Sequence, residues 1–77
     1  MNPKHEKIII PKGRKQLFSK VLTKLKKSDK QFQALMDKMP DIQTLTSHSY
    51  CYVPFDYAKR IKELYDELHY EKYGFVD

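Results

Sequence analysis

The segment from Pro11 to Lys27 constrains this chain more than any other, because it combines an apolar pattern with a strongly cationic one. Its apolar residues recur at the spacing of a single helix face; they are Leu17, Phe18, Val21, Leu22 and Leu25. The segment also holds cations and no acid; they are Lys12, Arg14, Lys15, Lys20, Lys24, Lys26 and Lys27. We predict a helix that begins near residues 12–14, ends at about Lys27, packs on one side and is positive on the other.

Positive charge is concentrated in the first half of the chain. The net charge is +5, yet residues 1–30 hold ten cations against Glu6 and Asp29, a balance of +8. Such asymmetry indicates an anionic partner. Nucleic acid is the leading candidate, DNA before RNA, with Lys30 added to the seven cations above as contacts. An acidic protein surface is the alternative partner, and a solvated face that keeps a small protein soluble is the third interpretation.

Length and cysteine content favour one small cytoplasmic domain. Seventy-seven residues make a single domain with a modest core. Cys51 is the single cysteine, so no intramolecular disulfide is possible. The polar N-terminus and the lack of a long apolar run predict neither a signal peptide nor a membrane span. We expect residues 1–6 to be a flexible start.

Two short segments have the composition of β-strands. Lys7–Ile10 is β-branched and is followed by Pro11, and His48–Val53 is aromatic and β-branched and is followed by Pro54. We expect the two to pair as a small ribbon, with two unpaired extended segments as the alternative. Residues 41–46 between them are expected to form an irregular turn.

A break near Ser28 decides whether residues 14–39 form one helix or two. Ser28 and Gln31 have the spacing of a capping box, which predicts a second helix from Asp29 to Met39 that stops before Pro40. The apolar residues Phe18, Leu25, Phe32 and Met39 recur every seven positions, however, and no Gly or Pro interrupts them. One continuous helix therefore remains an alternative.

The last helix is predicted to begin at Pro54 and to end at Tyr73, with Gly74 as its C′ residue. Phe75 and Val76 are expected to fold back onto its end. The predicted fold class is mostly α (α+β), a three-helix domain with a two-stranded β element in the order β-α-α-β-α. Its predicted core consists of Leu17, Val21, Leu25, Phe32, Leu35, Ile61, Leu64 and Leu68.

The chain carries no motif that predicts catalysis, a cofactor or a metal. His48 and Cys51 have a metal-like spacing, but a separation of three in a strand directs the two side chains to opposite faces. The tyrosines are weighed as stacking platforms for bases, but none lies in the basic half. We instead expect a protein interface or a homodimer surface on the last helix, formed by Tyr57, Tyr65, Tyr70 and Tyr73.

These observations predict a small basic nucleic-acid-binding regulator that contacts phosphates through the cationic face of its first helix. A helix-turn-helix would place Lys30, Gln31, Gln33 and Lys38 as base readers on its second helix, but the linker between the two helices has no glycine. The alternative function is a protein-binding module, an inhibitor or adaptor that acts through charge and a tyrosine-rich surface.

Overall fold

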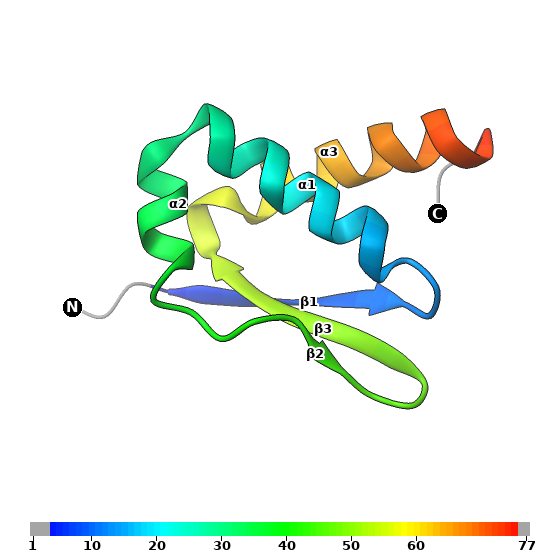
Figure 1. The fold of residues 1–77 in the computed structure, drawn as a ribbon, viewed down its shortest axis with the longest axis horizontal. Helices are drawn as coiled ribbons and strands as arrows, with labels where there is room; N and C mark the ends of the chain where they lie inside the picture. The colour runs from blue at the N-terminus through cyan, green and yellow to red at the C-terminus, as the bar shows by residue number, and fades with distance from the viewer. Residues whose placement is uncertain (1–3, 76–77) are drawn as a thin grey trace.

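A computed structural model describes residues 4–75 of the chain and confirms the predicted α+β fold class (Figure 1). The helices and strands follow one another as β1 (His5–Pro11), α1 (Lys15–Ser28), α2 (Lys30–Met36), β2 (Gln43–Thr44), β3 (His48–Pro54) and α3 (Phe55–Tyr73). The predicted order of elements is therefore present, with the short strand β2 added to it. The predicted flexible start overlaps β1 at residues 5–6, and residues 1–3 lie outside the described part of the chain.

The strands form an antiparallel sheet in the order β1-β3-β2. The predicted pairing of the two main strands is confirmed, with Ile8 opposite Cys51 and Ile10 opposite Ser49. β2 replaces part of the predicted irregular turn by placing Gln43 opposite Tyr50. Two polar residues do not produce a recognisable strand pattern, because their extended conformation comes from pairing with β3 and not from their own composition.

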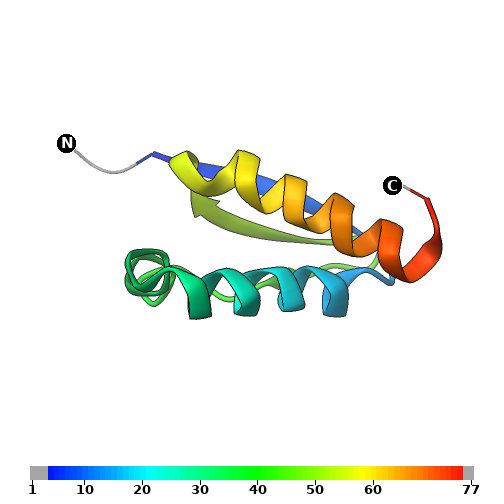
Figure 2. The same cartoon turned by 90° about the horizontal axis from the view of Figure 1, so that it is seen from above.

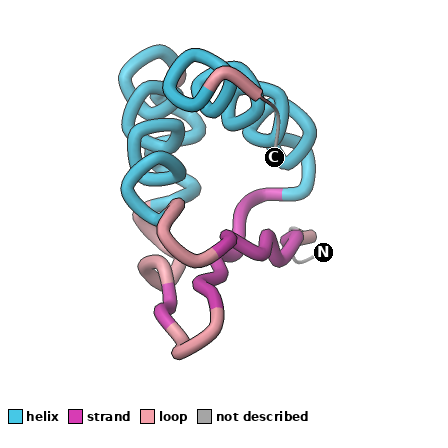
Figure 3. Tube along the Cα trace, turned by 90° about the vertical axis from the view of Figure 1, so that its right-hand side faces the viewer, coloured by secondary structure: helices cyan, strands magenta, loops and turns pink. Residues whose placement is uncertain are grey.

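The molecule has two layers, with the helices on one face of the sheet (Figure 3). Alternate strand residues therefore face the helices, as the period of two in a strand requires; the buried ones are Ile8, Ile10, Ser49, Cys51 and Val53. In the helix layer α1 and α3 lie side by side and run in opposite directions (Figure 2). The exposed side of α1 and the second face of the sheet are thus on different sides of the molecule.

The core lies between the two layers and includes most of the predicted residues. Leu17, Val21, Leu25, Phe32 and Ile61 are buried as predicted. Leu35, Leu64 and Leu68 are half-buried at its margin. The strands and neighbouring helix positions supply further buried side chains, which are Ile8, Ile10, Phe18, Leu22, Met36, Cys51, Val53 and Ala58.

A single extended residue, Asp29, separates α1 from α2 and confirms the predicted break. Its φ of −140° and ψ of 102° lie outside the helical region. Its carboxylate Oδ1 accepts the Phe32 backbone N–H at 3.1 Å, so the N-cap is Asp29 and not Ser28. The Ser28 hydroxyl instead donates back to the Leu25 carbonyl at 3.2 Å, within α1. The predicted second helix also ends three residues early, at Met36.

Two glycines permit the turns at the ends of the long helices. Gly13 has a φ of +84° in the turn between β1 and α1, and it therefore lies before the helix and not in its first turn. Gly74 has a φ of +80° and ends α3 as predicted, with its N–H donating to the Tyr70 carbonyl at 2.8 Å. Phe75 folds back as expected, with its ring centroid 5.0 Å from that of His69; Val76 lies outside the described residues.

Candidate nucleic-acid interface

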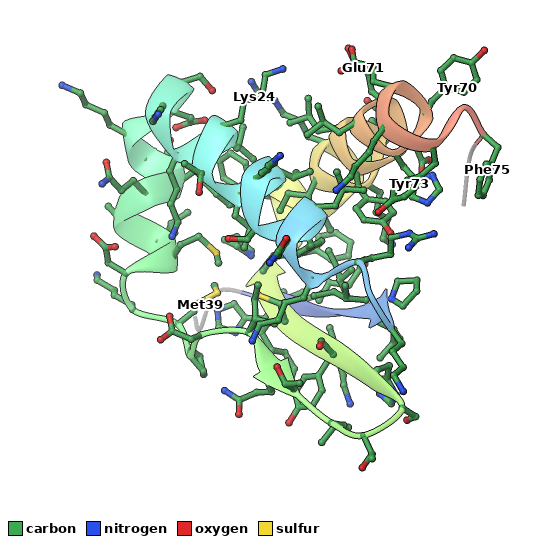
Figure 4. The ribbon with its side chains drawn as sticks, turned by 45° about the vertical axis from the view of Figure 1, so that its right-hand side comes forward. Lys24, Met39, Tyr70, Glu71, Tyr73 and Phe75 are labelled. Carbon is green, nitrogen blue, oxygen red and sulfur yellow. The ribbon has the colours of Figure 1, made fainter. Side chains whose placement is uncertain are left out.

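Three lysines of α1 form an exposed row on the helix layer. Lys20, Lys24 and Lys27 follow one another at intervals of four and three residues, so they lie on one side of the helix. Lys24 projects outward from α1 (Figure 4). Together with Ser19 and Thr23 they line a shallow depression of about 320 Å³. We call Lys20, Lys24 and Lys27 the lysine ridge.

The ridge has no neutralising partner in the described structure. The ion pairs found within residues 4–75 join Arg60 to Asp29 and Lys62 to Glu6, so none involves the ridge. The helix itself contains five lysines and no acid. At about 1.5 Å per residue, its 14 residues extend for about 21 Å. The ridge is therefore a local cationic surface to which no ion pair among residues 4–75 contributes a negative charge.

Two other predicted contacts, Lys15 and Lys26, lie on the opposite flank of α1. They line a groove of about 260 Å³ that α1 forms with residues 40–42, and Cys51 lies at its base. Lys15 is exposed, whereas Lys26 is half-buried. Asp41 also lines this groove, which makes it less positive than the ridge. The predicted lysines of α1 thus lie in two groups, and Ser19 and Thr23, which line both depressions, lie between them.

The remaining predicted lysines lie at the ends of α1. Lys12 is exposed in the turn that precedes the helix, and Lys30 is exposed at the start of α2. Lys12 is adjacent to Gly13 in a tight turn. Both positions are accessible to a ligand that also covers part of α1.

Arg14 is placed differently from the lysines, because it holds two helix ends together. Its Nε donates to Nε2 of His69 at 3.0 Å, and its guanidinium carbon lies 4.1 Å from the Tyr73 ring centroid. Nδ1 of the fully buried His69 lies 2.7 Å from the Phe75 carbonyl. Because Nε2 accepts, Nδ1 carries the proton and donates to that carbonyl. Arg14 therefore joins the start of α1 to the end of α3.

The four tyrosines predicted as a protein interface do not share one surface. Tyr57 is half-buried, packs 4.9 Å from Phe32 between ring centroids, and donates its hydroxyl to Asp29 Oδ2 at 3.0 Å. Burial and this hydrogen bond raise the pKa of the Tyr57 hydroxyl. Tyr65 and Tyr73 are also half-buried, whereas Tyr70 is 59% exposed and projects outward from α3 (Figure 4).

The second face of the sheet carries a polar and aromatic surface that the sequence analysis did not assemble. The strand residues that alternate with the buried ones point to this side; apart from the terminal Pro11 and Pro54, they are His5, Lys7 and Ile9 in β1, Gln43 in β2, and His48, Tyr50 and Tyr52 in β3. All are exposed or half-buried. We call these seven residues the open face. The predicted pairing of the two main strands, followed position by position, was the signal that could have found it.

The pair with metal-like spacing, His48 and Cys51, lies on different faces of β3. Cys51 is 1% exposed, and burial raises the pKa of its thiol, which disfavours the reactive thiolate. His48 belongs to the open face and Cys51 to the core face, so the pair cannot act together. Among residues 4–75 no group of three His, Cys, Asp or Glu side chains is arranged to hold a metal ion.

Comparisons with protein-family models, curated proteins and solved structures gave no match. No helix in residues 4–75 is long and apolar enough to cross a membrane.

Proposed function

We propose that the protein is a small nucleic-acid-binding regulator that contacts the phosphate backbone through the lysine ridge. The observation that carries the proposal is the row of Lys20, Lys24 and Lys27 on a helix without acids and without a described ion-pair partner. Lysine ammonium groups neutralise phosphates and release condensed counterions, which supplies affinity without reading sequence. Lysine is a compact cation and a poor bidentate reader of bases, so the ridge favours non-specific backbone contact.

Duplex DNA suits this ridge better than duplex RNA. The major groove of B-form DNA is about 12 Å wide and admits an α-helix, whereas the major groove of A-form RNA is deep and narrow. A helix about 21 Å long can follow the phosphates at the edge of such a groove. α2 contributes exposed polar residues beside it, Lys30, Gln31 and Gln33. These features support DNA as the preferred ligand.

The test is the salt dependence of binding to a short duplex, measured by fluorescence anisotropy over a range of salt concentrations. Each phosphate neutralised on duplex DNA contributes about −0.9 to the slope of log affinity against log salt. Replacing Lys20, Lys24 and Lys27 together by Gln should therefore reduce the magnitude of that slope by roughly 2–3. Gln is a good helix former, so the thermal midpoint should stay close to that of the parent protein.

A second triple variant separates local placement from total charge. Lys59, Lys62 and Lys72 are exposed lysines of α3, outside α1 and outside the concavity lined by Tyr52, and replacing them by Gln lowers the net charge equally. This variant should keep the parent salt slope. Equal slopes for the two triple variants would show that net charge alone governs binding. If the ridge variant still binds the duplex with an unchanged salt slope, residues other than the ridge contact the phosphates.

A further inference from the structure

We propose that the open face of the sheet is a second nucleic-acid site, which binds single strands by stacking an unpaired base on Tyr52. This site lies on the other side of the molecule from the lysine ridge. It does not depend on the ridge, because its residues come from the strands. The proposal rests on three features of the open face: its aromatic rings, its charge and the concavity at its margin.

The first feature is a pair of tyrosines on the central strand of the sheet. Tyr50 and Tyr52 are separated by one residue in β3, so both rings lie on the open face. Their centroids are 6.0 Å apart at an interplanar angle of 85°, an edge-on contact that supports the orientation of both rings. Tyr52 is 39% exposed. Aromatic rings displayed on a sheet are suited to stacking unpaired bases, since every base has a π-face.

The second feature is a positive charge beside these rings. Lys7 on the neighbouring strand β1 places its Nζ 4.3 Å from the Tyr50 ring centroid. None of the seven open-face residues is an acid. Glu6, the residue before Lys7 in β1, points to the helix side and pairs there with Lys62 at 2.6 Å. A surface with exposed rings, a cation and no carboxylate complements bases joined by phosphates.

The third feature is a concavity of about 750 Å³ that Tyr52 also lines, at the end of β3. Leu35, Met39 and Phe55 contribute apolar walls, and Phe55 is 56% exposed. Lys4 and Lys38 contribute cations to the lining, which includes one carboxylate, that of Asp56. This volume lies within the usual range for sites that enclose small molecules, so it can receive a nucleobase beyond the ring of Tyr52.

Fluorescence anisotropy with labelled oligo(dT) and oligo(rU), beside a DNA duplex, tests the proposal. Base–aromatic stacking is worth about 1–3 kcal/mol per base by alanine substitution. Tyr52→Ala should therefore weaken single-strand binding roughly 5- to 150-fold at fixed salt. Duplex binding should stay unchanged. Tyr52→Phe keeps the ring and should bind single strands like the parent protein.

Tyr70→Ala is the matched control, because Tyr70 is even more exposed and lies on α3. It should leave single-strand binding unchanged, and circular dichroism should show all three variants folded. Four results would overturn the proposal: no single-strand binding by the parent protein, equal binding by Tyr52→Ala, equal loss in Tyr52→Phe and Tyr52→Ala, or parallel loss on duplex and single strands. Capture of a protein partner whose binding needs Tyr52, without any effect on oligonucleotides, would assign the open face to that partner.

The two sites can fail independently. Replacing the ridge lysines by Gln leaves the open face intact. Adding Tyr52→Ala to that ridge variant should therefore still weaken its binding to oligo(dT). If the ridge variant keeps its duplex salt slope while Tyr52→Ala still loses single-strand affinity, the ridge proposal fails and the open-face proposal stands. If Tyr52→Ala no longer weakens oligo(dT) binding in the ridge variant, the claim that the two sites are separate is overturned.

Discussion

The lysine ridge and the open face differ in how the chain builds them. The ridge comes from one helix, and its residues recur at intervals of four and three positions. The open face joins Lys7 of β1 to Tyr50 and Tyr52 of β3, which lie far apart in the sequence and meet through strand pairing. A surface on one element can be found from periodicity, whereas a surface across strands also requires the register.

Both surfaces depend on the shared core, so removing a core side chain should have the largest effect on stability and binding. Phe32 is fully buried and packs against Tyr57. Phe32→Ala should lower the free energy of unfolding by about 3–5 kcal/mol. A small domain has only about 5–15 kcal/mol in total, so this loss is large. Urea denaturation measures it directly.

In the Phe32→Ala variant, nucleic-acid binding should weaken to the extent that the protein is unfolded. Where denaturant curves show partial unfolding, the apparent affinities for duplex and single strand should fall together by the unfolded fraction. A loss of less than about 1 kcal/mol would mean that the residues around Phe32 collapse into the space left by its ring. Unequal loss of the two affinities would show that one surface survives without the core.

Arg14 belongs to the basic segment, but unlike the lysines of the ridge it contacts His69 and Tyr73 within the fold. Arg14→Met keeps the aliphatic stem but removes the donor to the buried Nε2 of His69. Leaving a buried acceptor without its partner costs about 1–3 kcal/mol. Stability measured by urea should therefore fall, while the salt slope on duplex DNA stays at the parent value.

Lys12→Met is the control for Arg14→Met, since it removes the same charge from an exposed neighbour in the same turn. Its stability should stay within about 0.5 kcal/mol of the parent. A reduced salt slope for Arg14→Met, with unchanged stability, would show that the guanidinium leaves His69 and contacts phosphate instead. That result would return Arg14 to the nucleic-acid interface.

Much of the fold could be predicted because its signals are local. The apolar spacing of α1, the β-branched run before Pro11 and Gly74 after Tyr73 each act over a few residues. The missed features depend on tertiary contacts: β2 is extended because it pairs with β3, and His69 is buried because Arg14 and Phe75 satisfy its ring. The candidate sites also combine features that are set by local sequence with features that depend on tertiary contacts. Periodicity located the ridge, but it could not show that Arg14 turns inward or that Lys7 lies over Tyr50.

We expect the smallest change in stability at Asp29, the residue between α1 and α2. The hydrogen bond from the Phe32 N–H, with others from Tyr57 and Gln31, lowers the pKa of the Asp29 carboxyl despite partial burial. A lowered pKa in the folded state means that ionised Asp29 stabilises the fold above its ordinary pKa. This contribution is lost as the pH falls through the lowered value.

Asp29→Asn tests this directly, because Asn caps helices about as well as Asp but carries no charge. The variant should be slightly less stable than the parent at neutral pH. As the pH falls from the ordinary pKa of the Asp29 carboxyl to its lowered pKa, the free energy of unfolding should decrease less in the variant than in the parent. Urea denaturation at a series of acidic pH values measures this decrease. Parallel acid profiles for the two proteins would mean that the Asp29 charge does not contribute to the break between α1 and α2, and that the neutral cap alone positions Phe32.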